Sequence, residues 1–138
     1  MHNSTLLHRQ VHPAWVQDNQ LSSQVFETGV TNIPTGITSQ VFAPTPKDEN
    51  KLSVYNGEKF SAEEAYNHYV LELESAGVVS VTVEEANSTT LQCVEDNVPF
   101  DGHSYIDFAD LGTNQVKAKA KILKNFANKR NWTFRNTL

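Results

Sequence analysis

Residues 61–77 constrain the fold most, because they carry clear helix signals between two stretches that are typical of β-strands. Ser61 and Glu64 have the spacing of a capping box, and the apolar residues that follow recur at helical spacing. On either side, residues 51–55 and 78–83 alternate between apolar and polar side chains, as half-buried strands do. A helix enclosed by strands predicts a sheet with helices packed against it.

Turn residues and hydrophobic periodicity assign the other elements. Helices are predicted at 62–75 and 114–129, and strands at 21–26, 37–42, 51–55, 78–83, 103–108 and 132–134. We therefore expect an α+β fold with a mixed, mainly antiparallel sheet of about five to six strands and two helices packed on one face. The predicted core consists of Tyr66, Tyr69, Val70, Leu73, Val79, Val81, Leu123 and Phe126.

Two near-copies of one hexapeptide stand close together, LSSQVF at 21–26 and ITSQVF at 37–42. The connection between them is rich in Gly and Pro, so the pair predicts a hairpin or two equivalent docking edges. The length of 138 residues corresponds to one domain, 1–138. Residues 1–20 are polar and interrupted by Pro13, which predicts a loosely tied N-terminal arm.

Composition narrows the class of protein. Hydrophobic residues make up 38% of the chain and there is one cysteine, so a modest core without an internal disulfide is expected. No apolar run approaches the roughly 20 residues of a membrane helix. We expect a cytoplasmic protein with no cofactor, no metal and no membrane partner.

Charge is distributed unevenly along the chain. The formal net charge is −5, yet seven of the 11 basic residues lie after residue 112, where there is no acid. The candidates for binding a partner or an anion are Lys117, Lys121, Lys124, Arg130 and Trp132. A protein partner or homo-oligomer is favoured over nucleic acid, because the whole chain is acidic. A solvated lysine face, or a helix lying on the protein's own acidic surface, is the simpler alternative.

The strand at 103–108 carries the sharpest pattern for chemistry. Asp101, His103, Tyr105 and Asp107 fall on one face at a spacing of two. A histidine between carboxylates suits proton transfer or half of a metal site, although the outer face of an antiparallel strand is ordinarily polar. There is neither a nucleophile elbow nor a glycine-rich phosphate loop.

These patterns leave three functions open. Convergence of His12 and His103 in one cleft would favour a small nucleotide- or RNA-directed enzyme that also uses Lys47 and Asp107. Binding of nucleic acid by the basic C-terminal helix is another alternative. The negative evidence for catalysis favours a non-catalytic accessory or protein-interaction module.

The strings HPAWV from His12, TSQVF from Thr38, PTPKD from Pro44 and LSV from Leu52 resemble a family of small bacterial proteins. His103 before an apolar strand, and the Lys-rich helix that ends before Trp132, are similar as well. The resemblance implies a bacterial accessory protein and no particular activity. The favoured hypothesis is therefore an accessory or protein-interaction module of a bacterial multi-component system. Relative to that pattern, the second SQVF copy is an insertion.

Overall fold

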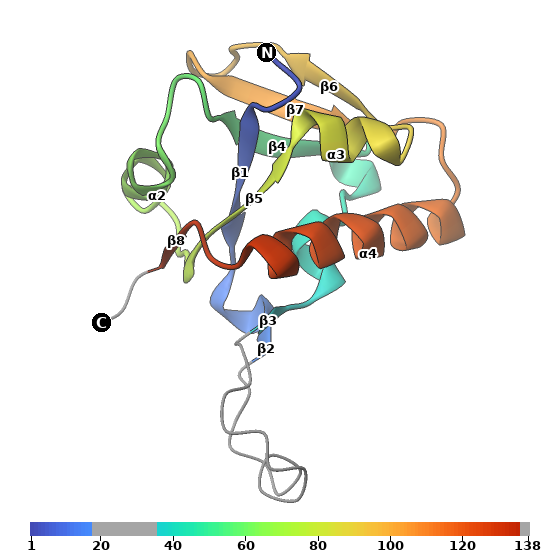
Figure 1. The fold of residues 1–138 in the computed structure, drawn as a ribbon, viewed down its shortest axis with the longest axis horizontal. Helices are drawn as coiled ribbons and strands as arrows, with labels where there is room; N and C mark the ends of the chain where they lie inside the picture. Colours follow the sequence, from blue (N-terminus) through green and yellow to red (C-terminus); the bar gives the residue numbers. More distant parts are fainter. Residues whose placement is uncertain (18–35, 136–138) are drawn as a thin grey trace, which may run out of the picture.

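The computed structural model describes residues 1–17 and 36–135. Its main feature is a six-stranded sheet in the order β6-β7-β4-β1-β5-β8, in which every paired strand is antiparallel (Figure 1). The strands are β1 (Leu6–Val11), β2 (Val16–Gln17), β3 (Gly36–Ile37), β4 (Lys51–Asn56), β5 (Gly77–Thr82), β6 (Gln92–Glu95), β7 (His103–Asp107) and β8 (Phe134–Arg135). The helices are α2 (Ala62–Tyr69), α3 (Val83–Ser88) and α4 (Thr113–Arg130), with short 3-10 helices η1 (Pro13–Trp15), η2 (Ser39–Phe42) and η3 (Pro46–Asp48). The predicted α+β class and antiparallel sheet are confirmed.

Strand β1 lies in the middle of the sheet, between β4 and β5. The prediction of a loosely tied arm is therefore wrong for Leu6–Val11. The strand is polar, but its buried polar groups have partners: Gln10 donates to the Ala65 carbonyl and accepts from the Ser75 hydroxyl, at 2.9 and 2.7 Å. Buried polar side chains with satisfied hydrogen bonds can occupy a central strand, and composition alone does not reveal those partners.

One face of the sheet packs against α4, α3 and η2. Leu7 and Val81 of the sheet lie in the same core cluster as Leu123 and Ala127 of α4, and all four side chains are buried. On α4 the buried residues recur at helical spacing, as its sequence predicts. The predictions that Val79, Val81 and Leu123 are core residues are confirmed, whereas Phe126 is half-buried.

Helix α2 lies on the opposite face of the sheet (Figure 1), where the backbone of Ala65 accepts from Gln10. The two predicted helices do not share a face, and that part of the prediction is wrong. The reason is that β5 is buried along almost its whole length, so it needs cover on both faces. Its neighbour β1 is buried on both faces too.

Helix α2 begins as predicted, with a capping box between Ser61 and Glu64, but it ends at Tyr69. The chain beyond it leaves the sheet, so Val70 and Leu73 are exposed and their assignment to the core is wrong. Tyr66 and Tyr69 are half-buried.

The second SQVF copy forms the 3-10 helix η2, in which the adjacent residues Val41 and Phe42 are both buried. A strand would place them on opposite faces, so the strand predicted there is wrong. The first copy lies outside the described residues.

Helix α3, with a capping box from Thr82 to Glu85, was not predicted. No helix in the described part of the chain is long and apolar enough to cross a membrane.

Candidate functional site

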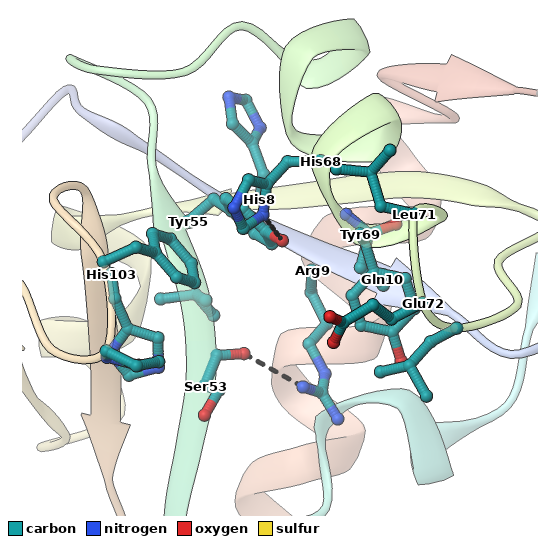
Figure 2. A pocket seen from close by; sticks show the side chains of 14 residues that line it. His8, Arg9, Gln10, Ser53, Tyr55, His68, Tyr69, Leu71, Glu72 and His103 are labelled. Atoms are coloured by element: carbon teal, nitrogen blue, oxygen red, sulfur yellow. Dashed lines mark hydrogen bonds between the residues drawn. The ribbon is translucent and has the colours of Figure 1, made fainter.

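A groove with a cavity of about 450 Å³ lies on the face of the sheet that also carries α2 (Figure 2). We call it the α2 groove. Its floor is made by β1, β4 and β7, and its walls by the α2–β5 loop, residues 70–76, and the β6–β7 loop, residues 96–102. The lining residues are His8, Arg9, Gln10, Ser53, Val54, Tyr55, His68, Tyr69, Leu71, Glu72, Leu73, Pro99, Phe100 and His103.

Strand register places the floor residues in a row. His8 of β1 is opposite Tyr55 of β4, and Tyr55 is opposite His103 of β7. Side chains directly opposite each other in antiparallel strands lie on the same face of the sheet. The predicted alternation of β7 is confirmed, because Ser104 and Ile106 are buried on the other face.

Arg9 occupies the place where β1 and β4 separate, since these strands pair only at Leu7 and His8. Its Nε donates to the Val41 carbonyl at 2.8 Å, and its Nη1 donates to the Ser53 carbonyl at 2.9 Å (Figure 2). Burial lowers the pKa of Arg9, but an arginine remains protonated at any physiological pH. No carboxylate of the described residues lies within 4.0 Å of this guanidinium.

Two imidazoles of the groove have an oxygen partner at Nδ1. His103 Nδ1 lies 2.7 Å from Asp96 Oδ1, and His68 Nδ1 lies 2.8 Å from the Tyr55 hydroxyl. Burial raises the pKa of Tyr55 to about 12, so the phenol keeps its proton, and the tautomer of His68 decides which of the two groups donates. In both pairs the Nε2 atom has no hydrogen-bond partner among residues 1–17 and 36–135.

His8 has a different role, because both of its ring nitrogens are already used. Nδ1 lies 2.8 Å from the Ser80 hydroxyl and Nε2 lies 3.0 Å from the Phe60 carbonyl. Burial lowers the pKa of His8, against the opposing effect of the Phe60 carbonyl. His8 therefore supports the floor of the groove as a neutral side chain.

Aromatic rings pack together in one wall of the groove. Phe100 packs against Tyr55, His68 and His103, with ring centroids 5.1, 4.5 and 5.4 Å apart. Phe60 contacts Tyr55 edge-on at 5.0 Å. Ring pairs at these distances stabilise one another beyond the area that they bury.

Exposed apolar side chains lie at the rim. Leu71 is 79% exposed and Leu73 is 58% exposed on one wall, and Val98, beside Pro99 of the other wall, is 66% exposed. Exposed apolar side chains that gather around a cavity mark interaction sites more often than isolated ones do.

The four residues of the predicted enzyme site are not brought together. His103 lines the α2 groove, but His12, Lys47 and Asp107 do not. His12 accepts a hydrogen bond from the Ala14 amide at the start of η1. It lies four residues beyond the groove residue His8, which corresponds to roughly 13 Å of extended chain. Asp107 accepts from the Ala109 amide, and Lys47 is in the exposed helix η3.

The basic C-terminal residues divide into two groups. Arg130 makes a two-pronged ion pair with Glu85, at 2.8 and 3.0 Å, and donates to the Ser80 carbonyl. Trp132 packs against the core with the Arg135 guanidinium 4.8 Å from its ring. Both side chains therefore have structural partners.

The lysines Lys117 and Lys121 are exposed and Lys124 is half-buried on α4. Among the described residues, none of the three lies within 4.0 Å of a carboxylate. They remain candidates for contacting an anionic partner.

The sequence patterns did not indicate most of the residues that line the groove. His8, Arg9 and Gln10 lie in the segment interpreted as an arm, although the apolar residues Leu7 and Val11 on either side were the available signal for a strand. The pairing of Tyr55 with His68 had no such signal, because it depends on how α2 crosses the sheet.

Metal and thiol chemistry have little support in this region. Within residues 1–17 and 36–135 there is no group of three or more His, Cys, Asp or Glu side chains able to hold a metal ion. Burial raises the pKa of Cys93 to about 11, so its sulfur remains a thiol and a weak nucleophile at neutral pH.

The fold is of the α+β class, and a groove with a cavity lies on one face of its sheet. Comparison of the chain with models of known protein families, with curated proteins and with solved structures found no match.

Proposed function

We propose that this chain is a non-catalytic protein-interaction module, and that it binds an apolar segment of a partner protein in the α2 groove. The observation that carries the proposal is the exposed apolar rim around a cavity that is walled by packed aromatic rings. The cavity volume of about 450 Å³ lies within the usual range for ligand sites of roughly 300–1,000 Å³. Such binding suits an accessory module of a bacterial multi-component system, and the sequence resemblance implies a bacterial accessory protein.

Selection from a displayed random peptide library tests this proposal. We expect enriched peptides to shift the backbone amide resonances of groove residues such as Tyr55, Leu73 and His103. Replacing Leu71 and Leu73 by Ser should weaken these peptides at least about tenfold, because two anchoring side chains are lost. The matched control is Ile122→Ser, which removes another exposed apolar residue, on α4.

Two results would contradict the proposal. The first is that enriched peptides shift the amide resonances of the lysine face of α4, or of the edge strand β6, and leave those of the groove residues unchanged. The second is that the paired leucine variant and the Ile122→Ser control bind the peptides equally well.

The contact between His103 and Asp96 favours a second candidate, a nucleotide- or RNA-directed enzyme. A carboxylate that holds Nδ1 of a histidine orients Nε2 as a general base. The binding proposal is preferred because, in the described part of the chain, no nucleophile is hydrogen-bonded to His103. The test is an assay for cleavage of single-stranded RNA and of ATP. Cleavage by the unmodified protein that disappears in His103→Gln would favour the enzyme over the binding module.

A further inference from the structure

The large exposed apolar side chains of the described residues lie in two regions of the molecule. Val70, Leu71 and Leu73 belong to the α2–β5 loop and Val98 belongs to the β6–β7 loop, and these two loops are the walls of the α2 groove. The remaining one, Ile122, is on α4. Apolar side chains that are exposed in groups mark interaction sites, and the charges beside them indicate what each region binds.

The α2–β5 loop combines its apolar side chains with acids. Residues 71–74 have the sequence Leu-Glu-Leu-Glu, and all four side chains are exposed. Figure 2 shows the Glu72 carboxylate turned into the groove. The loop contains no lysine or arginine, and no basic nitrogen of the described residues lies within 4.0 Å of the Glu72 or Glu74 carboxylate. We call residues 71–74 the leucine–glutamate segment.

Helix α4 has the opposite combination of side chains. Its exposed side includes Lys117, Ala118, Lys121, Ile122 and Lys129, because residues three or four apart are neighbours on a helix surface. Ile122 is 43% exposed. The helix contains no acid, and no carboxylate of the described residues lies within 4.0 Å of its three exposed lysines. We call these five residues the outer face of α4.

The two surfaces cannot meet within one molecule, because the sheet lies between them. The α2 groove is on one face of the sheet, whereas α4 packs against the other face and turns its exposed side away from it (Figure 1). Contact between the two surfaces therefore needs two molecules. Pairing of two different surfaces is a heterologous contact, which joins copies head to tail.

We infer that a second copy of this chain occupies the rim of the α2 groove, with the outer face of α4 in one copy on the leucine–glutamate segment of the next. In this contact Ile122 lies against Leu71 and Leu73, and the three exposed lysines lie beside the two glutamates. The inference rests on the function proposed above, because it names the partner. Both surfaces pair an exposed apolar side chain with charges of one sign, and the two signs are opposite.

The physical basis divides between the two kinds of side chain. Burial of Ile122 and the two leucines supplies the affinity. The charges orient the copies and suppress wrong pairings, although exposed ion pairs add little to the free energy. The association is therefore expected to be weak, reversible and sensitive to salt.

Sedimentation equilibrium of the full chain tests the inference. We expect the average mass to rise with protein concentration from about 10 μM to about 1 mM at low salt. The dissociation constant should increase at least about tenfold between about 0.05 M and about 0.5 M NaCl, because salt screens the charges that face each other across the contact.

Charge reversal assigns the association to the two surfaces. The variant Glu72→Lys with Glu74→Lys should be monomeric, and so should the variant Lys117→Glu with Lys121→Glu, because each then opposes like charges. An equimolar mixture of the two should associate, since every contact between unlike copies again joins opposite charges. Association on mixing also shows that both variants are folded.

A control variant separates this contact from an effect of net charge. Glu63→Lys with Glu84→Lys reverses two other exposed acids, on α2 and α3. It makes the same change in net charge as reversal of Glu72 and Glu74, and we expect it to associate like the unmodified protein.

Three results would overturn the inference. The first is a monomer at every concentration at low salt. The second is association that either charge-reversed pair leaves unchanged, or that the control pair abolishes equally. The third is a mixture of the two folded variants that stays monomeric. If library peptides occupy the groove while the chain remains monomeric, the proposed function stands and this inference falls.

Discussion

At the scale of single residues, His8 shows how burial fixes a protonation state. Its Nε2–H donates to the Phe60 carbonyl, so Nδ1 accepts from the Ser80 hydroxyl, and Ser80 in turn accepts from Thr133. The side chain is 3% exposed, and burial lowers the pKa of His8. Protonation would place an uncompensated charge inside the sheet.

The lowered pKa predicts a loss of stability in mild acid. Between the folded pKa and the ordinary value of 6.5, the unfolded chain binds the extra proton and the folded chain does not, so the free energy of unfolding falls as pH falls. From about pH 7.5 to about pH 5.5 we expect His8 to contribute a decrease of at most about 1.4 kcal/mol per pH unit. Urea titrations at both pH values measure this decrease.

In the variant His8→Gln the free energy of unfolding should depend less on pH. We expect this even though the variant is less stable than the unmodified protein at neutral pH. An unchanged slope in His8→Gln would show that His8 is not the group responsible.

At the scale of secondary-structure elements, α4 and the α2–β5 loop carry leucines with opposite surroundings. Leu123 on α4 is fully buried in the core, whereas Leu73 is 58% exposed at the rim of the groove. Both were predicted to be core residues, because both continue an apolar stripe at helical spacing. The difference arises where α2 ends and the chain leaves the sheet.

We expect Leu123→Ala to lower the free energy of unfolding by about 2–5 kcal/mol, because it leaves a cavity in the core. Leu73→Ala should change it by less than about 0.5 kcal/mol, as is usual for surface sites. Phe126→Ala should fall between the two, since Phe126 is half-buried. Urea denaturation measures all three, and equal effects at Leu123 and Leu73 would contradict the packing described above.

At the scale of the whole molecule, the basic C-terminal segment is only partly matched by acidic residues of the same chain. Arg130 is paired with Glu85 across the core face, whereas the Lys117, Lys121 and Lys124 ammonium groups have no carboxylate within 4.0 Å among the described residues. The alternative of a helix lying on its own acidic surface therefore has support at Arg130 and none at these lysines.

Changing Lys117, Lys121 and Lys124 to Gln should leave the free energy of unfolding within about 0.5 kcal/mol of its original value. Arg130→Gln should lower it by about 1–3 kcal/mol, because Glu85 and the Ser80 carbonyl lose charge-assisted hydrogen bonds. Urea denaturation gives both values. A gel-shift titration with single-stranded RNA at low salt tests the nucleic-acid alternative, and binding that the triple change abolishes would support it.

The strands β4, β5 and β7 and the helix α4 follow from local patterns, because alternation and helical spacing report which face of an element is buried. The start of α2 was equally predictable, since the capping box between Ser61 and Glu64 is a contact within one turn. The alternation of β7 also placed His103 on the correct face.

The α2 groove was not predictable in this way, because its residues meet through contacts between distant parts of the chain. His8 contacts residues 52 and 72 positions away, and Arg9 contacts residues 32 and 44 positions away. Those partners satisfy the polar side chains of β1 and so allow a polar segment to occupy the centre of the sheet. Local periodicity carries no information about such partners, and the assembled sheet alone places Arg9, Tyr55 and His103 around one cavity.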